Sequence, residues 1–431
     1  MIGTKDRTID TQTYGRGLEG LRFGETTVGR IDGRAGRLWY RGYPLEQLCE
    51  QSNFEEVAYL VMHGELPNRA EWDAWDRELR AWRTPPRDAL AVLQWLPTDA
   101  HPLMQYRTML SVAACMMPDL ENTRLDAQWQ RPARILAWTA ALAAAAIRHL
   151  KGQPPLPPKE HLGFAANFLW QALGREASEE ECRAFEVSLI VQAEHGLHAA
   201  ALGALLVIST GADLGGAVLA GMGALSGKLH GGANQDAFEM FHALSLGGPG
   251  RAQGFSEKAD RVQNDGTAAG VESRNPTSGA SRANQARQEG APGLSEKVDT
   301  TAVLDHARAW TRRKLEEGFR FPGFGHRVYK THDPRARALE PLAERMLRAT
   351  GHGVLWEVYG AVKHEVEAKL GPRGIFANVD AVTGLVYHPL GLPTASFPIP
   401  FALAIQTGWM AHCLEYIPSG RMIEPGSVYL G

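Results

Sequence analysis

The chain has 431 residues, of which 44% are hydrophobic and 22% are charged, and its formal net charge at pH 7 is -3. This length and apolar content allow a large buried core in two or three domains. The near-neutral charge argues against a nucleic-acid partner or an anionic membrane surface. The four cysteines have no paired spacing typical of a zinc site or a redox dithiol, so we interpret them as reduced thiols of a cytoplasmic protein: Cys49, Cys115, Cys182 and Cys413.

The first half of the chain predicts one small β-hairpin followed by helices. Residues 1–13 are polar and lack the apolar segment of a signal peptide. Alternating residues around Gly33 and Gly36 predict a hairpin between residues 25 and 41. Beyond Pro44, apolar residues recur every three or four positions, which is typical of amphipathic helices. Further helices are expected at residues 104–116, 132–150, 161–173 and 179–195.

Residues 199–227 form the most membrane-like stretch of the sequence. Ser209, Thr210, Gly211 and Asp213 break it into two segments, each shorter than the roughly 20 apolar residues that a spanning helix needs. Two buried helices are therefore expected. A helix that is apolar on every side has to be covered by its own chain or by a partner. This pattern, dense in glycine and alanine, favours a homodimer.

Residues 247–299 interrupt the helical pattern. Small and polar residues dominate there, and such a composition cannot bury enough apolar surface to offset the entropy of ordering. We predict a disordered surface insert. Its near repeat of residues 254–260 at 293–299 favours an inserted or duplicated sequence over a binding motif. After it, helices are expected at residues 303–317, 336–350, 354–370 and 401–414.

Three separate segments carry the residue types of a catalytic site. His230 precedes Gly231 and Gly232 at the start of a helical pattern, where the positive end of the helix favours a neutral imidazole. His326 lies in a loop rich in glycine and basic residues. Asp380 lies in an otherwise apolar run that would make its carboxylate a stronger base. Each residue alone also fits a structural role, as a turn residue or a helix cap, but together they indicate an acid–base site.

These three segments, in this order, resemble the citrate synthase family. The resemblance covers nearly the whole chain outside the insert, and it also includes the motifs Gly17-Leu18-Glu19-Gly20, Ile31-Asp32-Gly33, Tyr40-Arg41-Gly42-Tyr43-Pro44, Gly64-Glu65-Leu66-Pro67, His101-Pro102 and Glu194-His195. It implies a mainly α, two-domain helical fold with a small N-terminal β-hairpin. Residues 1–231 and 389–431 would form a large helical domain and residues 232–388 a small one, with the site in the cleft between them.

The resemblance also implies a reaction and a role for each of the three residues. An acyl-CoA, most simply acetyl-CoA, would be condensed with a 2-oxo acid, and the thioester would be hydrolysed to release CoA, as in the tricarboxylic acid cycle. Asp380 would remove a proton from the carbon beside the thioester carbonyl. His230 would donate a hydrogen bond to the enolate oxygen, and His326 would protonate the ketone oxygen. This chemistry needs no metal and no permanently bound cofactor.

Substrate-binding roles follow from the same resemblance. Arg335 would grip a carboxylate of the 2-oxo acid, because a guanidinium offers two parallel donors. His195 and His198 would contact the same acid. Arg327 and Lys330 resemble the basic positions near the phosphates of CoA, although exposed salt bridges explain both residues nearly as well.

Several positions depart from the family pattern. Glu194 replaces the usual aspartate, and His198 stands where the family commonly has asparagine. Ile405, Glu424 and Gly426 stand at positions where the family has arginines. Losing a buried charge-assisted pair typically costs roughly 2 to 5 kcal/mol of binding. We therefore expect an acceptor that is less anionic than oxaloacetate, or one that is held by other groups such as His198.

Two other functions remain open at this point. A catalytically impaired paralogue would keep the fold and CoA binding as a regulatory or interaction partner. The joint retention of His230, His326 and Asp380 argues against it. A metal protein is disfavoured, because no His-x-x-x-His or Glu-x-x-His pattern pairs these residues.

Overall fold

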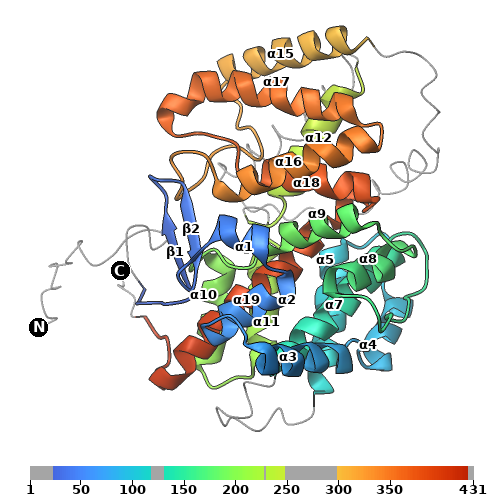
Figure 1. Cartoon of the computed structure of the whole chain (residues 1–431), viewed down its shortest axis with the longest axis vertical. Coiled ribbons are helices and arrows are strands. Elements are labelled where there is room, and N and C mark those ends of the chain that lie inside the picture. The colour runs from blue at the N-terminus through green and yellow to red at the C-terminus, as the bar shows by residue number, and fades with distance from the viewer. Residues whose placement is uncertain (1–22, 118–130, 228–229, 248–298, 426–431) are drawn as a thin grey trace, which may run out of the picture.

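The computed structural model describes residues 23–117, 131–227, 230–247 and 299–425. In these parts the chain is mainly helical with one small sheet, which confirms the fold class expected from the sequence (Figure 1). None of the described helices is both long enough and apolar enough to cross a membrane. The predicted disordered insert lies almost wholly outside the described residues, as does the polar start of the chain.

The predicted hairpin is present and extends to a third strand. β1 (Gly29–Asp32) pairs antiparallel with β2 (Arg37–Tyr40), which pairs with the short β3 (Tyr43–Pro44). At the tip of the hairpin, a Cβ on Gly33 would lie 2.2 Å from the Val328 carbonyl oxygen, so only glycine allows this close approach. The backbone N–H of Lys330 donates to the Gly33 carbonyl over 2.9 Å. The hairpin therefore braces the loop that follows His326.

Helices form the rest of the first half of the chain. α2, α3 and α9 each begin with a capping box, in which an Asn or Ser side chain and a Glu three residues later satisfy two free backbone donors. The helices are α1 (Leu45–Gln51), α2 (Phe54–His63), α3 (Arg69–Ala81), α4 (Arg87–Ala91), α5 (Pro102–Cys115), α7 (Arg131–His149), α8 (Phe164–Leu173) and α9 (Glu179–Ile190), with a 3-10 turn at Val92–Trp95.

α9 ends at Ile190, five residues before the predicted end at His195. The chain turns instead, because Gly196 has a φ of 66° and its carbonyl accepts from the backbone N–H of His198 over 3.0 Å. A helical period continued past Ile190 would have placed His195 and His198 on the α9 surface. The turn instead presents both rings from a loop.

The membrane-like stretch forms the two helices expected from its sequence. α10 (Ala199–Ser209) and α11 (Leu214–Leu225) pack against each other, with Gly203 beside Ala220. Both helices also contact α19 (Pro398–Tyr416), which is buried from Ala402 to Leu414. α19 additionally contacts α2, α7 and α9, so it forms the centre of the lower half in Figure 1.

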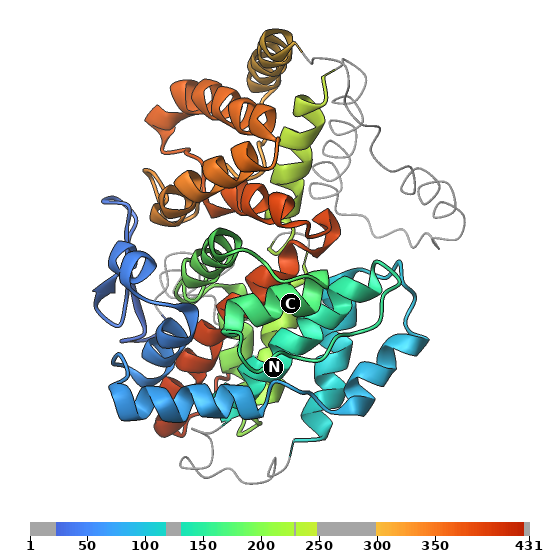
Figure 2. The same cartoon turned by 45° about the vertical axis from the view of Figure 1, so that its right-hand side comes forward.

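The remaining helices gather at the other end of the molecule. These are α12 (Ala233–Ser245), α15 (Thr300–Glu316), α16 (Pro334–Ala349), α17 (Gly353–Leu370) and α18 (Val379–Leu390), and they stay together in both views (Figure 1, Figure 2). Short 3-10 turns follow at Gly371–Arg373, Thr394–Ser396 and Ile417–Ser419. α9 is the element of the lower half that contacts both α16 and α18. The border between the two groups therefore runs along α9, next to the turn that carries His195.

Candidate active site

The His326 loop is tied directly to the segment that carries Asp380. The backbone N–H of Asn378 donates to the Gly323 carbonyl over 2.9 Å, and its side-chain amide donates to the Gly325 carbonyl over 2.7 Å. The Asn378 side chain also caps α18 by accepting from the Asp380 backbone N–H over 2.9 Å. One asparagine thus fixes both the glycine loop before His326 and the first turn of α18, where Asp380 lies.

His326 is held as a neutral ring with a defined tautomer. Its Nδ1 accepts from the backbone N–H groups of Val328 (3.0 Å) and Tyr329 (3.1 Å). Burial, reinforced by the charge of the neighbouring Arg335, lowers the pKa of His326 to about 4. Arg335 Nη2, which can only donate, approaches Nε2 at the longer distance of 3.4 Å. The two shorter backbone contacts to Nδ1 outweigh it and favour the tautomer with the proton on Nε2, which makes this nitrogen available as a donor.

Arg335 is fixed by a buried bidentate ion pair with Asp333. Its Nε lies 3.0 Å from Asp333 Oδ1 and its Nη2 lies 2.7 Å from Asp333 Oδ2. Arg335 Nη2 is also 3.4 Å from His326 Nε2. Asp333 in turn caps α16 and accepts from the backbone N–H of Val379 over 3.2 Å. The side-chain hydrogen bonds of Arg335 in the described structure use Nε and Nη2, and the ion pair fixes the orientation of the guanidinium group.

His195 completes one side of the cluster. The centroids of the His195 and His326 rings are 5.0 Å apart, and His195 Nε2 lies 3.3 Å from the Tyr329 hydroxyl. Burial, followed by the charge of Arg335, lowers the pKa of His195 well below its usual value. Both rings are therefore neutral at physiological pH.

His198 and His230 form a second pair of contacting rings. His198 Nδ1 lies 3.2 Å from His230 Nε2. Burial, followed by the nearby His230, lowers the pKa of His198 to about 3, and burial also lowers the pKa of His230. A Cβ on Gly231 would lie 2.1 Å from the Leu225 carbonyl oxygen, so only a glycine after His230 allows the backbone to pack this closely against the end of α11.

Asp380 has the electrostatics of a general base. Burial raises the pKa of Asp380 to about 6, and the charge of Arg335 limits the rise. The preceding residue, Val379, donates its backbone N–H to Asp333, the partner of Arg335, so the first turn of α18 that carries Asp380 is tied to this ion pair. A carboxyl group with this pKa is ionised at neutral pH and is more basic than an exposed one.

The other candidate residues differ in their exposure to solvent. Arg327 and Lys330 are exposed, and Lys330 Nζ donates to the His326 carbonyl over 3.2 Å. Ile405 is buried in α19, whereas Glu424 is exposed. Gly426 lies outside the described residues.

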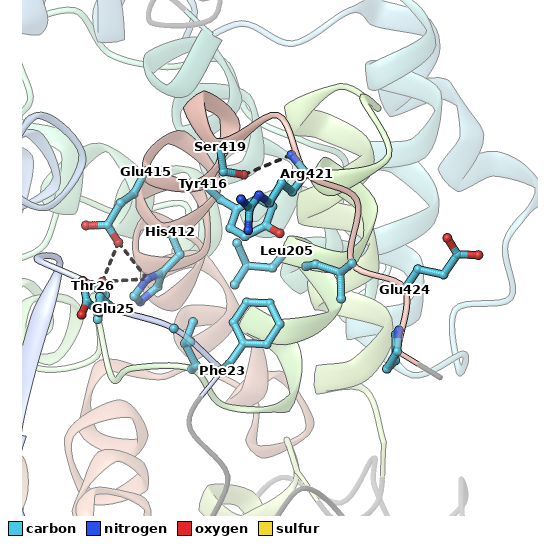
Figure 3. Close-up of a pocket in the computed structure, with 14 residues that line it drawn as sticks. Phe23, Glu25, Thr26, Leu205, His412, Glu415, Tyr416, Ser419, Arg421 and Glu424 are labelled. Atoms are coloured by element: carbon cyan, nitrogen blue, oxygen red, sulfur yellow. Dashed lines mark hydrogen bonds and ion pairs between the residues drawn. The ribbon is translucent and has the colours of Figure 1, made fainter. Parts of the chain in front are cut away.

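A hollow of about 770 Å³ lies beside the C-terminal segment, and none of His195, His198, His230 and His326 lines it (Figure 3). His412 contributes to its wall, with Nδ1 3.3 Å from the Thr26 hydroxyl and Nε2 3.1 Å from Glu194 Oε1. Glu194 also accepts from the backbone N–H of Gly196. Figure 3 shows Glu424 at the rim of this hollow, on the side away from His412. The hollow is thus connected to the turn that carries His195 through one buried ion pair.

Three residues of the site were not predicted to take part. Tyr329 contacts His195, Asp333 orients Arg335, and the Trp409 indole donates from Nε1 to His198 Nε2 over 3.3 Å. Asp333 could have been found from Asp-Pro at a helix start, which places its carboxylate at the N-cap. The sequence holds no local signal for Trp409, because the contact joins residues 211 positions apart.

The cluster combines neutral imidazoles, a weakly acidic carboxyl group and a fixed guanidinium within a helical scaffold. This set is typical of an enzyme that moves protons beside a carbonyl group. Among the described residues, no group of His, Cys, Asp or Glu side chains is arranged to hold a metal ion. The comparisons with known proteins agree. The family model described as "Citrate synthase, C-terminal domain" matches residues 17–270 and 278–426. The chain belongs to the citrate synthase family and is a citrate synthase-like acyltransferase.

Several relatives show how far the similarity extends. The chain is 29% identical to a citrate synthase of Deinococcus radiodurans, covering 96% of this chain and 95% of the relative. It is 30% identical to a 2-methylcitrate synthase of Mycobacterium tuberculosis, with 96% and 90% covered. The citrate synthase of Thermoplasma acidophilum, solved as a ternary complex with carboxymethyl coenzyme A and oxaloacetate, matches with a TM-score of 0.79 at 25% identity, covering 96% of each chain.

Proposed function

We propose that this protein condenses acetyl-CoA, or a related acyl-CoA, with a 2-oxo acid and hydrolyses the resulting thioester. Asp380 removes a proton from the acyl carbon, and the neutral His230 donates a hydrogen bond to the enolate oxygen. His326 donates from Nε2 to the ketone oxygen of the acceptor and protonates it as the carbon–carbon bond forms. No metal or permanently bound cofactor takes part, and the acyl-CoA is a co-substrate.

The observation that carries this proposal is the pairing of a raised carboxyl pKa with lowered histidine pKa values around one arginine. The pKa of Asp380 is about 6 and that of His326 is about 4, so at neutral pH the base is ionised and the hydrogen-bond donor is neutral. Groups whose pKa values are pushed in opposite directions by one environment are characteristic of acid–base sites.

Arg335 supplies one fixed guanidinium for the 2-oxo carboxylate of the acceptor. The far end of the acceptor lacks the arginines of the family pattern, because Ile405 is apolar and Glu424 is anionic. The proposal therefore includes an acceptor less anionic than oxaloacetate, such as a 2-oxo monocarboxylic acid. Arg327 and Lys330 are exposed close to His326 and are the proposed contacts of the CoA phosphates.

The quaternary and domain organisation is part of the same proposal. A homodimer is supported by exposed apolar side chains on α5 and α10, namely Met104 and Leu206, which an isolated chain would leave in water. Residues 232–388 are proposed as a small domain that closes on the remainder and excludes water. The four thiols are unpaired, which supports a cytoplasmic location.

Release of free thiol tests the proposed reaction. Purified protein is mixed with acetyl-CoA or propionyl-CoA and either oxaloacetate or 2-oxo monocarboxylic acids such as pyruvate and 2-oxobutyrate. Thiol release that requires both substrates supports the proposal, and a preference for the monocarboxylic acids supports the acceptor class. Binding of CoA with no thiol release from any pair would instead support a catalytically impaired paralogue.

A further inference from the structure

A chain of hydrogen-bonded rings connects α19 with His230. The Trp409 indole Nε1 lies 3.3 Å from His198 Nε2, and His198 Nδ1 lies 3.2 Å from His230 Nε2. The indole is fully buried, and Gly221 packs so closely that a Cβ there would lie 2.5 Å from the Trp409 ring. The start of this chain is therefore held rigidly by the packing of α11 on α19.

The direction of each hydrogen bond follows from the chemistry of the rings. An indole nitrogen can only donate, so His198 Nε2 must accept. His198 is neutral, because its pKa lies near about 3, and its single proton is consequently on Nδ1. This N–H donates to His230 Nε2, which must accept in turn. The neutral His230 ring then carries its proton on Nδ1.

We propose that His198 is a positioning residue that fixes the tautomer of His230, so that Nδ1–H of His230 is the group presented to the acyl thioester. The inference rests on the proposed function, because it specifies how His230 stabilises the enolate. Both ring nitrogens of His198 are engaged by Trp409 and His230, so this role replaces the direct contact with the acceptor that the sequence suggested.

The alternative tautomer of His230 is disfavoured by a direct conflict of donors. With its proton on Nε2, His230 would point an N–H at the N–H of His198 across 3.2 Å. Neither buried donor would then have a partner, and the loss of such a bond shifts an equilibrium by roughly ten- to a hundredfold. Removing the hydrogen bonds from Trp409 to His198 and from His198 to His230 therefore lowers the fraction of His230 that carries its proton on Nδ1.

Three substitutions separate positioning from substrate binding. His198→Leu removes both hydrogen bonds, whereas His198→Asn keeps one acceptor and one donor in a side chain. Trp409→Phe keeps the buried ring and removes only the indole N–H. Trp138→Phe is the matched control, because Trp138 is also buried and its indole N–H has no hydrogen-bond partner in the described structure.

We expect His198→Leu to lower kcat by about ten- to a hundredfold. Trp409→Phe is expected to lower kcat by a smaller factor, and His198→Asn is expected to restore most of the loss. The KM for the 2-oxo acid stays within about twofold in all three, and Trp138→Phe changes neither constant. A rise in the KM for the 2-oxo acid in both His198 variants, with kcat unchanged, would show a substrate contact and overturn the proposal.

The tautomer is also measured directly, without turnover, by NMR of protein labelled with nitrogen-15 in its histidine rings. The His230 signal, assigned by its loss in His230→Gln, should show a protonated Nδ1 in the wild-type protein and a mixture in Trp409→Phe. A His230 ring protonated on Nε2 in the wild-type protein would overturn the proposal that His198 fixes its tautomer. Absence of thiol release from the wild-type protein would refute the proposed function alone, because the NMR result does not depend on it.

Discussion

The residues proposed to act on the acyl carbon and the residues expected at the far end of the acceptor differ in how closely they follow the resemblance to the citrate synthase family. Asp380, His230 and His326 are all present: His230 contacts the His198 ring, His326 accepts from backbone N–H groups, and Asp380 is buried deeply enough to raise its pKa. At the far end of the proposed acceptor, Ile405 and Glu424 stand where the family resemblance leads us to expect arginines. The comparison suggests that the reaction and the choice of acceptor depend on separate elements, so the second can change while the first is kept.

The largest effect on the rate is expected when the proposed base, Asp380, is replaced. Asp380→Asn removes the base and should lower kcat by roughly a thousandfold, because positioned general bases contribute about 10²- to 10⁴-fold. The exposed Asp99→Asn is the matched control and should leave the rate unchanged. Circular dichroism and CoA binding should stay at the wild-type level in both. A variant that retains a tenth of the rate would remove Asp380 from the mechanism.

The next largest effect is expected at Arg335, the proposed contact of the 2-oxo carboxylate. Replacing Arg335 alone would leave Asp333 buried without its partner, which costs about 3 to 5 kcal/mol of stability. The double variant Arg335→Gln with Asp333→Asn removes both charges together. Its KM for the 2-oxo acid should rise by roughly a hundredfold, since a buried charge-assisted contact contributes about 2 to 5 kcal/mol. Its KM for the acyl-CoA should not change, and an equal rise in both constants would contradict the assignment.

The far end of the acceptor offers a way to sharpen the comparison. Ile405→Arg combined with Glu424→Arg restores two guanidinium groups of the family pattern. The ratio of kcat/KM for oxaloacetate to kcat/KM for pyruvate should rise by about tenfold, equivalent to roughly 1.4 kcal/mol of added discrimination. Ile405→Leu keeps the site apolar and serves as the control. An unchanged ratio in the double variant would show that neither position faces the acceptor.

The smallest effect is expected on the thermal stability of the protein. The pKa of Asp380 is raised to about 6 in the folded protein, so ionising this buried carboxyl group disfavours folding at higher pH. This unfavourable contribution is complete above pH 6 and disappears below the unfolded pKa of about 4. Asp380→Asn should therefore raise the Tm by a few degrees at pH 8 and leave it unchanged at pH 4. An equal rise at both pH values would contradict the raised pKa.

The sequence predicted the helical fold because its signals are local. The capping pairs, the small-residue helices α10 and α11 and the hairpin around Gly33 each follow from residues close together in the chain. The end of α9 was placed too late, because the helical period of the side chains continues beyond the point where Gly196 and its turn redirect the backbone. Periodicity alone does not contain that information.

For the site, the sequence supplied the residues but not their partners. The histidines were candidates from motifs, yet the contact of His195 with His326 and that of His198 with His230 depend on tertiary packing. The contact of Trp409 with His198 depends on how α19 crosses α11, which no local pattern records. Because both ring nitrogens of His198 have partners in the structure, we propose it as a positioning residue and not as the substrate contact that the sequence suggested.

The pH dependence of thiol release tests the central claim most directly. If Asp380 is the base, kcat/KM for acetyl-CoA should fall as the pH drops through about 6, because protonation of this one carboxyl group removes the base while His326, whose pKa is about 4, stays neutral. Below the midpoint the rate should fall tenfold for each pH unit. A rate that stays constant from pH 8 to about pH 5 would contradict the account.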